Sequence, residues 1–261
     1  NLHFLKSETT NEGGELRDAI YRFMINAAFC NLYINNYEKN YIMLVHTSVK
    51  MEKHKEDQVI CNKLFSDLKN KGSRSFLKHM ERIEKLAFKK TENEKQATEI
   101  TSYIANNGDR NQIGILNSDK TNNYMVDITK FSEDPPVPFT ISIGGNVISR
   151  GITFNNLMGM FFTRGVKNIM QQDTYIQRAR MFGSRDKDIN QFELTIPEDL
   201  YKQWYSCFFL HRLSYLSAQN NLHPVWLEGI KTRAVAPASI DRANVNVDRG
   251  MMSFEKVKFK K

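Results

Sequence analysis

The chain has 261 residues, of which 41% are apolar and 25% are charged, which is ordinary for a globular protein with a sizeable core. The formal charge of +8 favours an anionic partner, and nucleic acid is the common one. The same excess is also typical of solvated helix faces, so the charge alone leaves both interpretations open. No stretch reaches the roughly 18 apolar residues that a membrane span needs. No membrane-spanning segment is therefore predicted, and a membrane is not an expected partner.

Targeting and redox signals favour a cytoplasmic protein. The opening residues, NLHFLKSETT, have no basic flank followed by an apolar run and do not predict a signal peptide. The three cysteines, Cys30, Cys61 and Cys207, are far apart and odd in number, so we interpret them as reduced core thiols. No Cys-x-x-Cys pair suggests zinc, and no metal ligand is predicted.

The first part of the chain is predicted to be mainly helical. A three- and four-residue apolar period opens it, carried by Leu16, Ile20, Phe23, Ala27, Cys30 and Ile34. The run Tyr41 to His46 is short and apolar and predicts a buried strand. A helix with the stripe Ile60, Leu64 and Leu68 follows and ends near Gly72. Residues 73–107 then predict further charged helices, which we interpret as a helical insertion.

The second part predicts short strands followed by a long helix. The apolar runs are Ile113 to Leu116, Phe139 to Ile143, Leu157 to Phe162 and Phe192 to Ile196. After Pro197 an amphipathic helix is predicted to about Asn220, with its inward face formed by Leu200, Trp204, Phe208 and Tyr215. Strands alternating with helices predict an α/β domain with a mostly parallel sheet, in which Phe139 to Ile143 is an inner strand.

The segment ISIGGNVISRGITF (Ile141 to Phe154) carries the first candidate site. A buried strand runs directly into Gly144-Gly145-Asn146, and Ser149-Arg150-Gly151 follows. Ligands of parallel α/β sheets bind beyond the carboxyl ends of the strands, where glycines let backbone N–H groups approach a phosphate. A tight turn that needs glycine only for its backbone geometry is the alternative. No Gly-x-x-x-x-Gly-Lys-Ser/Thr occurs in the chain, so no P-loop is predicted.

The segment DTYIQRARMFGSR (Asp173 to Arg185) carries the second candidate site. It is predicted to be helical from Asp173 to Met181, with Asp173 as a helix cap, and it contains Gln177, Arg178, Arg180 and Arg185. An arginine that reaches across an interface to a transferring phosphate is a known catalytic device. A basic surface helix is the plainer interpretation of the same residues.

Together these two segments resemble the Z1 domain family, the carboxy-terminal RecA-like half of superfamily-two helicase-like ATPases in restriction and phage-defence systems. The segments Leu16 to Phe29 and Tyr41 to Ser48 resemble that family's opening helix and its Met-Leu-Val-His strand. The resemblance spans about residues 14–235 and implies a RecA-like (P-loop NTPase-type) α/β fold with residues 73–107 inserted. Residues 236–261 are then an extension or the start of a further segment.

The resemblance also implies roles for individual residues. Those expected to contact DNA, as helicase motif V, are Ser149, Arg150 and Thr153. Those expected to contact ATP are Gly144, Gly145, Gly151 and Asp173. Those expected to be catalytic, as motif VI, are Gln177, Arg180 and Arg185, with one of the two arginines as the arginine finger. The chain departs from the family pattern at Ala179, where glycine is usual, and at Met181 and Ser184, where aromatic residues are usual.

Two functions follow as hypotheses. In the first, the chain is the second half of an ATP-dependent DNA helicase or translocase and cannot hydrolyse ATP alone. It would need ATP, Mg²⁺, DNA, a P-loop-bearing first RecA-like domain on the same or another chain, and a nuclease subunit or domain. In the second, it is a non-hydrolysing nucleic-acid-binding or scaffold domain, which Ala179 and the missing P-loop favour. His46 ends a predicted strand and is interpreted as a hydrogen-bonded structural histidine, with contact to nucleotide or nucleic acid as the alternative.

Overall fold

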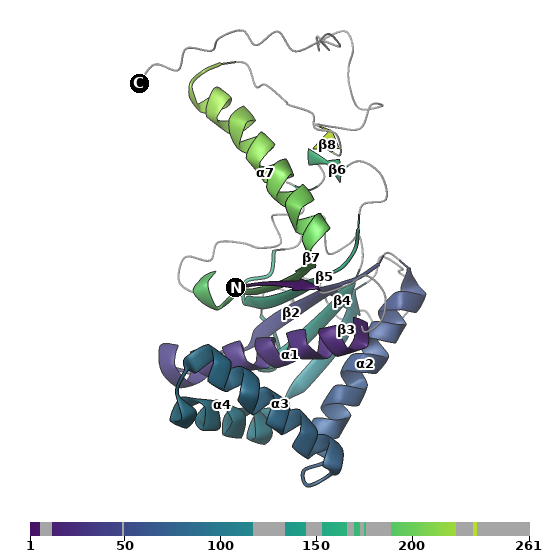
Figure 1. The fold of residues 1–261 in the computed structure, drawn as a ribbon, viewed down its shortest axis with the longest axis vertical. Helices are drawn as coiled ribbons and strands as arrows, with labels where there is room; N and C mark the ends of the chain where they lie inside the picture. Colours follow the sequence, from purple (N-terminus) through teal and green to yellow (C-terminus); the bar gives the residue numbers. More distant parts are fainter. Residues whose placement is uncertain are drawn as a thin grey trace.

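A computed structural model describes residues 1–5, 12–48, 50–116, 134–144, 153–165, 170–172, 175, 189–222 and 232–233. Its centre is a six-stranded parallel sheet with the order β1-β7-β5-β2-β4-β3 (Figure 1). The strands are β1 (Leu2–Leu5), β2 (Tyr41–His46), β3 (Asn111–Leu116), β4 (Phe139–Gly144), β5 (Leu157–Phe162) and β7 (Glu193–Pro197). The predicted α/β, RecA-like class and the inner position of β4 are both confirmed.

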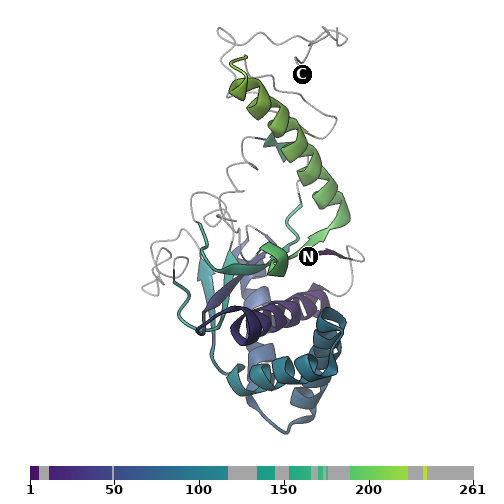
Figure 2. The ribbon, with the colours of Figure 1, turned by 90° about the vertical axis from the view of Figure 1, so that its left-hand side faces the viewer.

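Four helices cover one face of this sheet (Figures 1 and 2). They are α1 (Glu12–Phe29), α2 (Met51–Lys69), α3 (Arg74–Thr91) and α4 (Glu94–Asn107). Side-chain oxygens cap the last two of these helices at their first turns: Ser73 accepts a hydrogen bond from the Phe76 N–H, and Asn93 accepts one from the Gln96 N–H. Because α3 and α4 pack on α1, residues 73–107 form part of the helical layer, and their status as an insertion stays a prediction.

The opposite face is covered by α7 (Glu198–Gln219), which rises beyond the sheet (Figures 1 and 2). Its buried side chains are Leu200, Trp204, Cys207 and Ser214. The predicted inward positions of Phe208 and Tyr215 are wrong, because these side chains are 37% and 55% exposed. The buried residues are instead Cys207 and Ser214, each one residue earlier in the sequence. The predicted inward face was therefore displaced by one residue in the later turns of the helix. The short strands β6 (Met170–Gln171) and β8 (Thr232–Arg233) pair separately.

The central strands are apolar because they are covered on both faces. All six residues of β2 are buried, with Met43 and Val45 on the α1 side and Ile42 and Leu44 on the α7 side. At Gly159 the sheet and α1 approach closely, since a Cβ atom there would lie 3.3 Å from the Phe23 Cβ.

Ile34 does not continue the buried stripe of α1 and is exposed, because the helix changes to a π-helical turn at Cys30–Ile34, which alters the angular spacing. The three cysteines are buried and none of them forms a disulfide within the described residues, in agreement with the predicted reduced thiols.

Candidate functional site at the carboxyl edge of the sheet

The strands β2, β4 and β5 end side by side at one edge of the parallel sheet. Their last residues are His46, Gly144 and Phe162. In parallel α/β folds this edge is where ligands bind, because the strand ends and the loops that follow them converge there. The predicted site residue Gly144 is buried at this edge.

His46 is the central side chain of this edge. It is 1% exposed, and its Nδ1 lies 2.6 Å from the carbonyl oxygen of Gly144. A carbonyl oxygen only accepts, so the hydrogen-bond network assigns the proton to Nδ1 and leaves Nε2 as an acceptor. The ring stacks on Phe162, with 4.7 Å between centroids. The interpretation of His46 as a hydrogen-bonded histidine is confirmed.

Arg164 is the functional candidate that sequence analysis missed. Its Nη1 lies 3.4 Å from the Nε2 of His46, and its backbone N–H donates to the His46 carbonyl oxygen at 3.4 Å. Arg164, which is half-buried, therefore contacts His46 through both its guanidinium and its backbone. The available signal was its position two residues after a fully apolar strand, which places a side chain at this edge.

The loop after β2 is held by α2. The Thr47 hydroxyl donates to the Asp57 carboxylate at 2.5 Å, and the Nε2 of His54 lies 2.8 Å from the Ser48 carbonyl oxygen. Asp57 and His54 are both buried. These contacts hold the backbone of residues 47–48, directly after His46, in a defined position at this edge.

Most of the predicted site residues lie outside the described part of the chain. Of those within it, Gly144 ends β4 beside His46, and Thr153 is exposed shortly before β5. The predicted residues outside the described ranges are Gly145, Ser149, Arg150, Gly151, Asp173, Gln177, Arg180 and Arg185. Their roles stay predictions, as do the predicted helix from Asp173 and the extension at 236–261.

The described part of this edge contains a cation, Arg164. Within the described ranges, no three His, Cys, Asp or Glu side chains are arranged to hold a metal ion. Arg164 supplies a guanidinium, which suits an anionic group such as phosphate.

None of the described helices is long and apolar enough to cross a membrane.

Comparison with known families places the chain. A family model described as the Z1 domain matches residues 15–212. The comparisons with curated proteins and with solved structures found no match. The matched range is more than half of the chain and contains β2, β4, β5 and both motif segments. The chain therefore belongs to the Z1 domain family.

Proposed function

We propose that this chain is the carboxy-terminal motor half of an ATP-dependent DNA helicase or translocase of a restriction or phage-defence system. We assign this role to residues 14–235, with 236–261 as an extension or the start of a further segment. The observation that carries the proposal is the carboxyl edge of the sheet. There the inner strands end together, and His46 holds the guanidinium of Arg164 beside Gly144.

We place ATP at this edge, between this chain and the P-loop domain. Gly144, at the end of an inner strand, is followed directly by Gly145, and Arg164 supplies positive charge that suits a phosphate. We propose that Gly144, Gly145, Gly151 and Asp173 contact ATP from one side while the P-loop domain holds it from the other. We assign the Mg²⁺ ion to that partner, because in P-loop ATPases the P-loop Ser/Thr and a Walker-B aspartate hold it.

In this proposal one motif segment contacts DNA and the other contacts the γ-phosphate of ATP. Ser149, Arg150 and Thr153 contact the DNA backbone, and Arg180 or Arg185 meets the charge that develops on the γ-phosphate. Gln177 lies beside them in the sequence and helps to position the reacting groups. Contacts to the backbone carry no direct sequence information, so DNA binding by this chain should depend on salt and little on sequence.

The second candidate is a RecA-like scaffold that grips nucleic acid or a partner and hydrolyses nothing. Ala179 in the motif VI segment and the missing P-loop favour it. The two functions differ in one observable, which is whether adding the P-loop domain produces ATP turnover.

The test measures ATP hydrolysis by the chain alone, by the P-loop domain alone and by both together, with and without DNA. We expect no turnover by the chain alone, because phosphoryl transfer also needs a phosphate cradle and a metal ligand. We expect DNA-stimulated turnover from the combination. A combination that binds DNA without turnover supports the scaffold instead, and turnover by the chain alone contradicts both assignments.

A further inference from the structure

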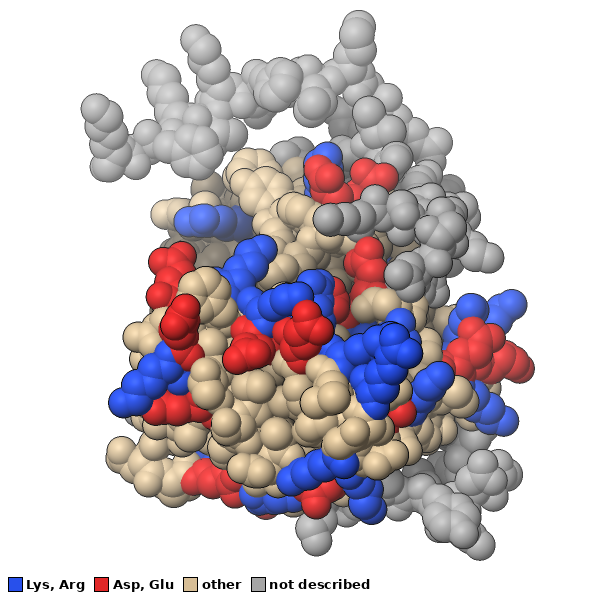
Figure 3. Space-filling view, turned by 60° about the horizontal axis from the view of Figure 1, so that its bottom comes forward, with Lys and Arg blue, Asp and Glu red and all other residues tan. Residues whose placement is uncertain are grey.

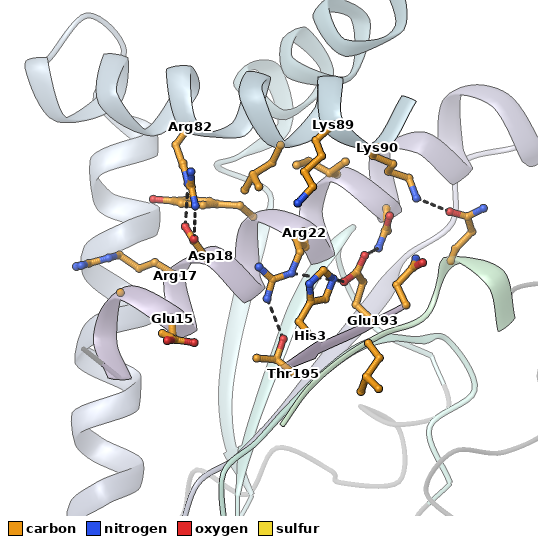
Figure 4. A pocket seen from close by; sticks show the side chains of 18 of the residues that line it. His3, Glu15, Arg17, Asp18, Arg22, Arg82, Lys89, Lys90, Glu193 and Thr195 are labelled. Atoms are coloured by element: carbon orange, nitrogen blue, oxygen red, sulfur yellow. Dashed lines mark hydrogen bonds and ion pairs between the residues drawn. The ribbon is translucent and has the colours of Figure 1, made fainter. Parts of the chain in front are cut away.

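A large groove lies on the α1 side of the sheet, away from the residues of the carboxyl edge described above. Its volume is about 1150 Å³, and its lining comes from β1, β7, α1 and α3 (Figure 4). None of His46, Gly144 and Arg164 lines it. It is therefore separate from the described part of the proposed nucleotide site.

The floor of the groove is a buried polar network around Glu193, which is 8% exposed. Its Oε2 lies 2.5 Å from the Nε2 of His3 and 3.4 Å from the Nε of Arg22. Its Oε1 accepts from the Asn26 amide at 3.0 Å. Burial raises the pKa of Glu193, but the hydrogen bonds from His3 and Asn26 and the charges of His3 and Arg22 outweigh it, so the pKa lies below its ordinary value. The only acid of the floor is thus already neutralised within the described structure.

The groove has more cations than acids. Six Lys or Arg residues line it, against three Asp or Glu residues. Asp18 is already paired with Arg82, and Glu193 is held as above. Figure 3 shows Lys and Arg interspersed with Asp and Glu on the helical side of the molecule. Within the groove lining, Lys and Arg outnumber Asp and Glu.

Three of the lining cations have no hydrogen bond or ion pair within the described residues, namely Arg17, Lys78 and Lys89. Figure 4 shows Lys89 reaching from α3 toward Arg22, with Arg17 toward the other end. Lys78, Arg82 and Lys89 follow one another at steps of four and seven residues, which places them on one face of α3. This row of charge lines the groove.

Two partly buried cations would also gain from an anion. Burial lowers the pKa of Lys90, and burial lowers the pKa of Arg22 although the nearby Glu193 opposes the shift. The desolvation of these two cations is therefore not fully offset by their neighbours. A negative ligand in the groove would restore part of the lost charge interaction.

The spacing of the free cations indicates what kind of anion fits. Lys78 and Lys89 are eleven residues apart in α3, which corresponds to about 16 Å along the helix axis. A single phosphate would meet only one of them. We propose that this groove binds a ligand that carries several phosphates in a row, either a polyphosphate group or a stretch of single-stranded nucleic-acid backbone. This site goes beyond the proposed motor function and does not depend on it.

The test uses the full chain and two probes. Inorganic tripolyphosphate is titrated by calorimetry, and a labelled single-stranded oligonucleotide is titrated by fluorescence anisotropy at several salt concentrations. The test variant is Lys78→Gln/Lys89→Gln. The matched control is Lys63→Gln/Lys69→Gln, which removes the same charge from exposed positions of α2 outside the groove. All four side chains are exposed, so both variants should fold.

We expect the groove variant to bind its ligand about tenfold more weakly and the control to change less than about twofold. For the oligonucleotide, the slope of log K against log salt should become shallower by about 1.4, since two phosphate contacts are lost. Loss of tripolyphosphate binding identifies a compact ligand, and loss of oligonucleotide binding alone identifies a strand.

Three results would overturn the proposed groove site. The first is that neither probe binds, and the second is that the groove variant and the control lose the same affinity. The third is that tripolyphosphate does not bind, while oligonucleotide binding is abolished by Arg150→Ala and left intact by Lys78→Gln/Lys89→Gln; in that case the proposed motor function survives.

Discussion

The centre of the sheet and its β7–β1 border are built on different physical principles. In β2, β4 and β5 every residue is buried, and the α1 side presents apolar side chains such as Met43 and Phe139. At the border the same face presents Glu193, Thr195 and His3, and β1 alternates between exposed and half-buried residues. One helix, α1, packs on both regions, with Phe23 over the centre and Arg22 over the border.

The apolar centre mainly stabilises the fold, whereas the charged border is suited to binding an anionic ligand. Apolar burial at the centre does not depend on the protonation of any side chain, and it supplies the larger part of the stability. A charged network stabilises less than an apolar core of the same volume, because the ions must be desolvated. The border therefore costs stability relative to an apolar packing, while it presents the charge that an anionic ligand needs. The following variants test this contrast.

The largest effect is expected at the centre, from Phe139→Ala. Phe139 is 0% exposed, and its ring lies 6.4 Å from the rings of Phe23 and Tyr103. Its truncation should lower the free energy of unfolding by about 3–5 kcal/mol through lost burial and a residual cavity. Urea unfolding measures it. Phe4→Ala, at a 43% exposed border position, is the control and should cost about 1 kcal/mol or less. Equal losses would contradict the contrast.

A smaller effect is expected at the border, from Glu193→Gln. The change leaves Arg22 and His3 without their carboxylate, so we expect a loss of about 2 kcal/mol at neutral pH. The folded-state pKa of Glu193 lies below its ordinary value, so its stabilisation is fully present above the unfolded pKa of about 4.3. It is lost as the pH falls through the folded pKa.

The difference between Glu193→Gln and the unchanged chain should therefore shrink below about pH 4. The loss caused by Phe139→Ala should stay constant over the same range. Unfolding curves at a series of pH values separate the two, and a Glu193→Gln difference that grows on acidification would show that the sign of the pKa shift is wrong.

The centre was predictable from sequence because its physics is local. Runs such as Tyr41 to His46 are apolar without interruption, which is the pattern of a strand covered on both faces. The family motifs likewise directed attention to the edge where Gly144 lies. In contrast, α7 has large apolar and aromatic side chains on more than one face, so periodicity chose Phe208 and Tyr215 where Cys207 and Ser214 are buried.

The border and the His46–Arg164 pair were not predictable because their contacts are distant in sequence. β1 is four residues long and is recognisable only through its pairing with β7. Glu193 meets Asn26 across 167 positions, and Arg164 meets His46 across 118. No periodicity within a segment reports such a meeting. The motif residues from Gly145 onward, including Arg180 and Arg185, lie outside the described ranges, so their placement stays a prediction.

The most direct test of the proposed motor function is ATP turnover by the assembled protein carrying Arg180→Ala or Arg185→Ala. The matched control is Arg212→Ala, an exposed arginine of α7 without a described partner. If one of the two arginines is the finger, its removal should lower turnover by roughly 10³–10⁵-fold and leave DNA binding largely intact, whereas the control should keep its rate within about twofold. Full turnover by both Arg180→Ala and Arg185→Ala would contradict the assignment and leave the non-hydrolysing scaffold as the better account.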